Sequence, residues 1–321
     1  MVPPRAAGAA GEEMSLRSSA VDGGRGGRGV TRGPENRPSA GVVAGFAALA
    51  AMVVLQVASG MAEDAAGFVN PIVGVMAASA ICFAAAARGR GRALAAFAAA
   101  ALVGYLAEAV GESTGLPFGA YRYTGVLWPE AGPVPLTVCV AWGGMGLAAY
   151  GVAGAISRRW AVGLGAAALT AWDLFLDPQM VRLGLWTWAE AGPYRGVPLT
   201  NYAGWFLVSL LVMAVIRGTL GAPGRIRGLP LLYAVMAAME TLAFATVFEP
   251  RDPLVAAVGG VAMGGFAAAA WWRARKGASA RAGAATRRPL PAWARARAGG
   301  RVPLRPGPRG WARAWGRSWR G

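Results

Sequence analysis

The sequence predicts an all-α membrane protein, a bundle of about eight transmembrane helices that contains an internal repeat. The chain has 321 residues and is 55% hydrophobic, with a mean hydropathy of +0.42, a composition typical of polytopic membrane proteins. Apolar segments long enough to cross a hydrocarbon core, which takes roughly 20 residues, occur repeatedly along it. In addition, one polar loop motif occurs twice.

The predicted helices cover residues 40–60, 67–87, 92–111, 135–156, 160–177, 201–219, 229–249 and 253–272. We expect the fifth to end before Pro178, because the residue before a proline is pushed out of the helical region. Residues 1–39 and 273–321 are low-complexity, Arg-rich segments. They are expected to be disordered tails around a transmembrane catalytic domain at 40–272. No cleaved signal peptide is expected, because residues 1–39 have no apolar stretch.

The charges of the loops alternate along the chain. One set of loops is basic, with Arg88, Arg90, Arg92, Arg158, Arg159, Arg217, Arg225 and Arg227. The other set contains Glu63, Asp64, Glu112, Glu130, Glu190, Glu249 and Asp252, with only Arg122, Arg182, Arg195 and Arg251 among them. By the positive-inside rule both termini are cytoplasmic, in a multi-pass protein of the cell membrane. The carboxylates near the helix ends, including Asp177, then lie toward the non-cytoplasmic leaflet.

The net charge of +17 belongs to the tails. Residues 273–321 contain fourteen basic residues and no acid, whereas the core at 40–272 has a net charge of only +1. A basic tail beside the cytoplasmic leaflet would attract anionic lipids of the bilayer. A nucleic-acid partner is not expected.

The internal repeat is a loop motif with similar flanks. Glu130-Ala-Gly-Pro-Val-Pro-Leu-Thr137 recurs at 190–200 as Glu-Ala-Gly-Pro-Tyr-Arg-Gly-Val-Pro-Leu-Thr. Tyr121-Arg-Tyr123 precedes the first copy and Trp186-Thr-Trp188 precedes the second. Trp142 and Trp205 follow the two copies. Two helices separate the copies, so both loops lie on one side of the membrane. This arrangement predicts a parallel repeat about an axis along the membrane normal.

Two pairs of carboxylates at i, i+4 are the strongest candidates for chemistry. Asp173 and Asp177 share one helix face, as do Glu108 and Glu112 in the first copy. Ionisable groups at membrane depth are costly and usually functional. A carboxyl group buried beside a second one can keep its proton at neutral pH and act as a general acid. The alternative is structural, with an aspartate capping a helix or pairing with an arginine. Glu240 and Glu249 are weaker candidates.

Aromatic residues gather near these carboxylates. They are Tyr121, Tyr123, Trp128, Trp142, Trp172, Trp186, Trp188, Tyr194, Tyr202 and Trp205. An interfacial belt accounts for some of them without any function. Rings beside carboxylates can also stabilise a cation through their faces.

The residue types that are missing exclude several kinds of chemistry. The chain contains no histidine, so a di-iron site with several histidine ligands cannot form. Cys82 and Cys139 lie in separate apolar segments and are expected to be inert hydrophobic residues. No phosphate-binding glycine loop follows a strand. No metal or redox cofactor is therefore expected, and any oxygen added to a substrate should come from water.

The linked motifs resemble the membrane carotenoid hydratases, the bisanhydrobacterioruberin and gamma-carotene hydratases. The resemblance spans about residues 40–272. Its motifs are 112–123 (Glu-Ser-Thr-Gly-Leu-Pro-Phe-Gly-Ala-Tyr-Arg-Tyr), Val134-Pro-Leu, Trp142, 172–178 (Trp-Asp-Leu-Phe-Leu-Asp-Pro), Trp186-Thr-Trp188 and 196–205 (Gly-Val-Pro-Leu-Thr-Asn-Tyr-Ala-Gly-Trp). The long Arg-rich C-terminal tail departs from the family pattern.

This resemblance implies addition of water across the terminal C1–C2 double bond of an acyclic carotenoid. A carboxylic acid of the Asp173/Asp177 pair would protonate the alkene. Glu112, or Glu108 on the same face, would orient and deprotonate the attacking water. Substrate contacts are expected from Tyr121, Tyr123, Trp142, Trp172, Trp186, Trp188, Asn201 and Trp205. Other carotenoid enzymes are candidate partners.

Two other functions fit the sequence less well. A membrane prenyltransferase binds diphosphate through Mg²⁺ held by Asp-rich motifs. Asp173 and Asp177 resemble one such motif, but the chain has only five aspartates and the second motif is missing. A proton-coupled transporter would use the carboxylates as a relay.

Overall fold

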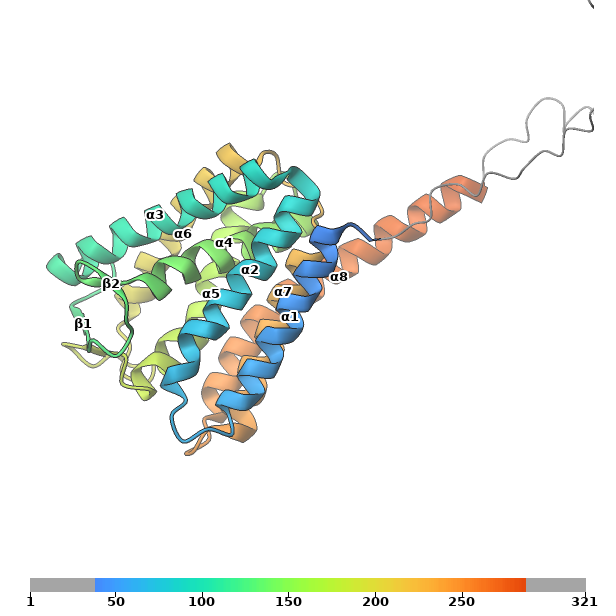
Figure 1. The fold of residues 1–321 in the computed structure, drawn as a ribbon. Helices are drawn as coiled ribbons and strands as arrows, with labels where there is room; N and C mark the ends of the chain where they lie inside the picture. The colour runs from blue at the N-terminus through green and yellow to red at the C-terminus, as the bar shows by residue number, and fades with distance from the viewer. Residues whose placement is uncertain (1–37, 287–321) are drawn as a thin grey trace, which may run out of the picture. The chain divides into compact units, whose positions relative to one another are not determined.

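The computed structural model describes residues 38–286 and shows an all-α bundle with short strands in its loops (Figure 1). Its helices are α1 (Ala40–Ser59), α2 (Val69–Arg88), α3 (Arg90–Thr114), α4 (Leu136–Ile156), α5 (Ala161–Arg182), α6 (Leu199–Leu220), α7 (Gly228–Leu242) and α8 (Pro253–Thr286). A 3₁₀ turn at Ala66–Phe68 leads into α2, and a π-helical turn at Ala243–Val247 extends α7. Each predicted span is confirmed as a helix.

Seven of the described helices are long and apolar enough to cross a membrane. The eighth, α5, falls short of that composition and contains both Asp173 and Asp177. It nevertheless packs inside the bundle against α4, α6 and α8. Its polar residues are therefore enclosed by other helices, as expected for ionisable groups at membrane depth.

The centre of the bundle is α4, which contacts α2, α3, α5, α7 and α8. Every residue of this helix from Ala141 to Gly154 is buried. Small residues make the close packing possible, as is usual between membrane helices. At Gly151, for example, an added Cβ would lie 2.3 Å from the Cβ of Leu229 on α7.

The loop strands join the two copies of the repeat. β1 (Tyr121–Tyr123) pairs antiparallel with β4 (Trp186–Trp188), and β2 (Glu130–Ala131) forms a hairpin with β3 (Val134–Pro135). In the β1–β4 pair, Tyr121 is opposite Trp188 and Tyr123 is opposite Trp186. Equivalent residues therefore exchange partners, which is the pattern produced by a local two-fold axis. This pairing supports the predicted repeat.

The predicted end of the fifth helix is wrong. Pro178 lies inside α5, which continues to Arg182. Pro178 has no N–H and leaves the carbonyl of Leu174, four residues earlier, without its helical donor. The Tyr194 hydroxyl donates to that carbonyl over 3.1 Å, so a loop side chain replaces the missing hydrogen bond.

The loop that contains Tyr194 is anchored by an ion pair. Nε of Arg195 lies 2.5 Å from Oδ2 of Asp252, and Nη2 donates to Oδ1 over 2.7 Å. Partial burial opposes ionisation of Asp252, but the arginine outweighs it and holds the pKa of this carboxyl below its usual value. The contribution of the pair to stability is thus present above the usual pKa of aspartate and is lost as the pH falls through the lowered one.

The last helix is longer than predicted. Residues 273–286 were assigned to the C-terminal tail but are helical in the structure. Arg275 lies 3.9 Å from the ring centroid of Trp271, and Lys276 lies 3.8 Å from that of Trp272. These i, i+4 contacts and the helix-forming Ala, Arg and Lys residues account for the extension. The rest of the predicted tails, residues 1–37 and 287–321, is outside the described residues.

The orientation of the bundle can be tested by cysteine labelling. In a chain with Cys82→Ala and Cys139→Ala, we expect Ala131→Cys and Ala191→Cys each to react with a membrane-impermeant maleimide in intact cells. The positive-inside rule places both loops outside. Arg158→Cys, in a basic loop, should react only after the cells are opened. An even number of membrane spans between residues 131 and 191 puts both on the same side. Labelling of only one of them in intact cells would therefore contradict this topology.

Candidate functional site

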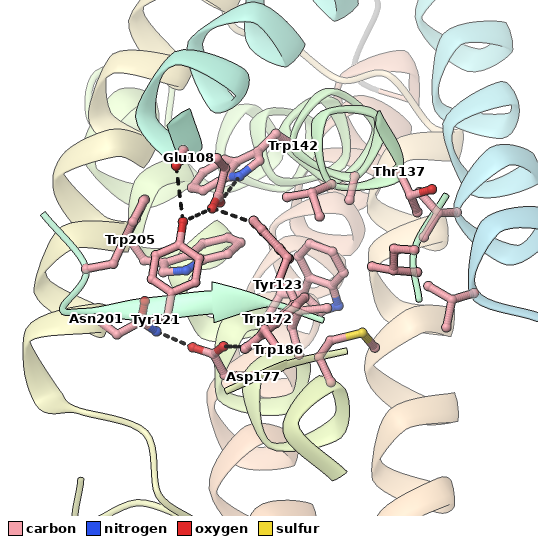
Figure 2. Close-up of a pocket in the computed structure, with 18 of the residues that line it drawn as sticks. Glu108, Tyr121, Tyr123, Thr137, Trp142, Trp172, Asp177, Trp186, Asn201 and Trp205 are labelled. Atoms are coloured by element: carbon pink, nitrogen blue, oxygen red, sulfur yellow. Dashed lines mark hydrogen bonds between the residues drawn. The ribbon is translucent and has the colours of Figure 1, made fainter. Parts of the chain in front are cut away.

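A cavity of about 60 Å³ lies where the two halves of the repeat meet. Helices α3, α4, α5 and α6 form its walls together with β1 and β4, and the start of α2 closes one side (Figure 2). Its polar lining residues are Glu108, Tyr121, Tyr123, Thr137, Asp177 and Asn201. Tryptophans, Phe118, Met180 and aliphatic residues supply the rest of the lining.

Glu108 accepts hydrogen bonds from three side chains in this cavity. The hydroxyls of Tyr121 and Tyr123 donate to Oε2 over 2.5 and 2.8 Å, and Nε1 of Trp142 donates to Oε1 over 2.9 Å (Figure 2). Burial, followed by the charge of Glu108, raises the pKa of Tyr123, so this hydroxyl remains a donor. Each carboxylate oxygen has two lone pairs, so one acceptor position is left, on Oε1.

Asp173 and Asp177 are connected by one amide. Nδ2 of Asn201 donates to Oδ2 of Asp173 over 2.7 Å and also to Oδ2 of Asp177. Nε1 of Trp186 donates to the other oxygen of Asp177 over 2.8 Å. Asp173 is fully buried, and its Oδ1 has no hydrogen-bond partner in the structure. The two carboxyl groups are therefore close neighbours, and only Asp177 lines the cavity.

Three tryptophans form one wall. The rings of Trp142 and Trp205 are stacked, with centroids 4.0 Å apart and an interplanar angle of 18°. Trp172 meets Trp205 edge to face at 6.2 Å. Trp142 and Trp205 are equivalent residues of the two repeat copies, so this stack, like the β1–β4 pair, joins the two halves. All three rings are buried.

The two copies differ at one position that changes the hydrogen bonding of the carboxylates. The motif alignment that equates Thr137 with Thr200 also equates Val138 with Asn201, and both of these residues line the cavity. Asn201 connects the aspartates of the second copy. Valine offers no such bond in the first copy. The cavity thus has a hydrogen-bonded aspartate pair on one side and a single enclosed glutamate on the other.

The structure brings most of the predicted site residues together. All eight expected substrate contacts line the cavity: Tyr121, Tyr123, Trp142, Trp172, Trp186, Trp188, Asn201 and Trp205. Glu108 and Asp177 also line it, and Asp173 lies behind Asp177. Glu112 is partly exposed and is not among the lining residues. Glu249 lies at the exposed surface, 3.7 Å from Arg251, and Glu240 lines a second cavity.

The apolar lining residues were not predicted from the sequence. They are Val69, Val73, Phe118, Leu127, Val138, Ala141, Leu176 and Met180. In a membrane helix, the residues that face lipid and those that face a cavity are both aliphatic, so the sequence does not distinguish them. Only Phe118 and Leu176 lay inside recognised motifs, so position in a motif was the one signal that could have found any of them.

Fold and cavity define the class: an all-α, polytopic membrane protein with a carboxylate-containing pocket lined by aromatic residues. A family model described as carotenoid biosynthesis protein matches residues 67–266, and the chain belongs to this family. Over 149 residues it is 33% identical to the bisanhydrobacterioruberin hydratase of Haloarcula japonica. That alignment covers 43% of the chain and 50% of the relative, so the chain spans about half the length of this curated protein. No solved structure matches the chain.

Close packing beside the site can be tested with two glycines. A Cβ at Gly104 on α3 would lie 2.4 Å from Cγ of Trp142, whereas a Cβ at Gly163 on α5 would meet nothing within 4 Å. We expect Gly104→Ala to destabilise the protein by about 1–3 kcal/mol, as overpacking does. The apparent melting temperature in detergent should fall. Gly163→Ala is the matched control and should leave it unchanged or raise it. Equal melting temperatures would contradict the α3–α4 contact.

Proposed function

We propose that this protein is a carotenoid hydratase that adds water across the terminal C1–C2 double bond of an acyclic carotenoid. The observation that carries the proposal is the pair Asp173/Asp177, connected by Asn201 and placed across one aromatic cavity from Glu108. Membership of the carotenoid biosynthesis family and the hydratase name of the Haloarcula japonica relative support it.

The aspartate pair supplies the proton. Two neighbouring carboxyl groups in an apolar site cannot both be ionised cheaply, so the pair keeps one proton. Asp177 is the member that lines the cavity, and it protonates C2 of the alkene. The O–H bond of the acid breaks as the C–H bond forms. Asp173 is a positioning residue, because it contacts Asn201 but does not line the cavity.

Protonation at C2 leaves a tertiary cation at C1. The faces of aromatic rings attract cations electrostatically, and Trp172, Trp186 and Tyr123 all line the cavity beside Asp177. Trp186 is held in place because its ring nitrogen donates to Asp177. The ring nearest the acid is thereby fixed where the positive charge forms.

Water completes the reaction. Its oxygen forms the C–O bond at C1, and its proton passes to Glu108, whose Oε1 has an acceptor position left. The cavity of about 60 Å³ exceeds the roughly 10–15 Å³ that one water requires. It can therefore hold one water beside a small alkyl end group. The product is a tertiary alcohol, and the proton must return to the aspartate pair before the next turnover.

The two alternatives lack comparable support in the structure. Mg²⁺ bound by a prenyltransferase would need several carboxylate oxygens without competing donors, but each oxygen of Asp177 already accepts one side-chain hydrogen bond and keeps only one lone pair. Among the described residues there is no group of three or more carboxylates and thiols able to hold a metal ion. A transporter would need a relay across the membrane, whereas Glu108, Asp173 and Asp177 gather at one cavity.

The source of the new oxygen gives a first test. In a lycopene-producing host that expresses the full chain, growth in H₂¹⁸O should label the tertiary hydroxyl, measured by mass spectrometry of the pigments. Growth under ¹⁸O₂ in ordinary water should leave it unlabelled. Label from ¹⁸O₂ would overturn the hydration mechanism, because the oxygen would then come from an oxidation.

The general acid can be tested by substitution. Asp177→Asn keeps the size of the side chain but removes the acidic proton, and loss of a general acid typically costs about 10²–10⁴ in rate. We expect unhydrated carotenoid to become the main pigment in the expressing host. Expression level and apparent melting temperature report whether the variant is folded.

Glu112→Gln is the matched comparison, because Glu112 is the repeat equivalent of Asp177 but is not among the lining residues. We expect this variant to retain most of the hydrated pigment. A folded Asp177→Asn variant with near-normal hydration would show that the pair is structural. Loss of hydration in Glu112→Gln but not in Asp177→Asn would show that Glu112, and not Asp177, is the essential carboxyl group.

A further inference from the structure

A second and larger cavity, of about 330 Å³, adjoins the first. Residues of α1, α2, α5 and α7 line it, together with the π-helical turn that extends α7. Most of these residues are aliphatic or methionine, such as Ile72, Met76 and Met239. The proposed reaction takes place in the first cavity, and Trp172 and Leu176 are the only residues of the recognised motifs that also line the second one.

The cavity reaches the surface of the bundle through apolar residues. Val57 and Met61, at and just after the end of α1, are exposed and line it, as do the exposed Leu242 and Val247 at the end of α7. On a membrane-spanning bundle such residues face lipid. The opening therefore lies near the ends of the helices and can admit apolar molecules from the bilayer.

Two buried polar atoms inside this apolar cavity have no partner. They are Oε2 of Glu240 on α7 and Oε1 of Gln56 on α1. Glu240 is only 7% exposed. The amide nitrogen of Gln56 contacts the sulfur of Met236 at 3.4 Å, one turn before Glu240 on the same face. The two unpartnered atoms therefore belong to neighbouring side chains.

The chemistry of these atoms defines what can bind. The carbonyl oxygen of Gln56 only accepts hydrogen bonds, so the ligand must donate one. A hydroxyl group has one proton to donate, so a hydroxyl that donates to Gln56 accepts from Glu240, whose carboxyl donates when it is protonated. The remaining walls favour an apolar body. A mainly apolar space is poorly suited to water alone, which needs two to four polar partners.

We propose that Gln56 and Glu240 form a binding site for the hydroxyl group of an elongated apolar molecule that enters from the bilayer. The hydroxyl donates its one proton to Oε1 of Gln56 and accepts a hydrogen bond from the protonated carboxyl of Glu240, which satisfies both buried atoms. The two cavities share Val69, Val73, Trp172, Leu176 and Met180 in their linings. The apolar part of the ligand thus lies against the far side of the same wall that borders the reaction cavity.

The test measures binding without turnover, so it is independent of the proposed hydration. The purified full chain in phosphatidylcholine nanodiscs is titrated with tritiated geranylgeraniol. The competitors are unlabelled geranylgeraniol and the hydrocarbon in which hydrogen replaces its hydroxyl. Concentrations are expressed as mole fraction in the bilayer, so that differences in partitioning cancel. We expect the alcohol to bind about tenfold more tightly than the hydrocarbon, the value of one or two hydrogen bonds.

Variants then assign the preference to the two residues. Gln56→Leu and Glu240→Leu should each reduce the alcohol preference to about twofold or less while hydrocarbon binding is retained, which also shows that they fold. Gln179→Leu is the matched control, because Gln179 lines the same cavity but has no buried unpartnered atom. It should keep the tenfold preference.

Oleyl alcohol and 9-octadecene form a second pair of competitors, which separates an isoprenoid source of the ligand from an acyl-lipid source. A hydroxyl preference in either pair that both leucine variants abolish supports the site, and the tighter alcohol identifies the source. Equal binding of alcohol and hydrocarbon by the unmodified protein overturns the proposal. So does a preference that persists in both leucine variants.

Discussion

The architecture depends on one constraint: a carboxylate buried in a membrane bundle needs hydrogen-bond donors that the helices cannot supply by themselves. Glu108 and Asp177 take theirs largely from the loop segments β1 and β4. Tyr121, Tyr123 and Trp186 come from these strands and donate to the two carboxylates inside the bundle. Burial of the acids therefore depends on the position of these loop strands. The same contacts that make burial tolerable also build an aromatic cavity around the acids.

The repeat explains why the cavity lies where it does. The β1–β4 pair and the Trp142–Trp205 stack both join equivalent residues of the two copies. A site on such an axis has two similar halves unless a residue breaks the symmetry. Asn201, where the first copy has Val138, is such a residue. It connects the two aspartates of the second copy, whereas the first copy places one glutamate, Glu108, in the cavity. A proton donor and a separate acceptor are the two different roles that acid–base chemistry requires.

Much of the fold and of the polar site could be predicted from the sequence, because membrane depth makes their signals strong. Long apolar runs define helices, and carboxylates or clustered rings within them stand out. The i, i+4 spacing of Glu108 and Glu112 correctly placed the two on one face. It could not tell which of them faces the cavity, since that depends on packing against Trp142 and the tyrosines. Similarly, local sequence rules predict that a helix ends at Pro178. The helix continues because Tyr194, from a loop, donates to the Leu174 carbonyl that the proline leaves without a donor.

The hydrogen-bond donors in the cavity also affect the fate of a tertiary cation. Such a cation can add water to give the alcohol, or lose a proton from carbon and return to an alkene. A base near the cation can remove a proton from carbon as well as from water. Glu108, occupied by three donors, has a single acceptor position left and so can accept from one direction only. The ring nitrogen of Trp188 is a buried donor without a partner in the same cavity lining, suited to hold a water oxygen. In the proposed mechanism, one acceptor and one donor would favour a positioned water over the carbon-bound protons, and selectivity for the alcohol would follow from this geometry.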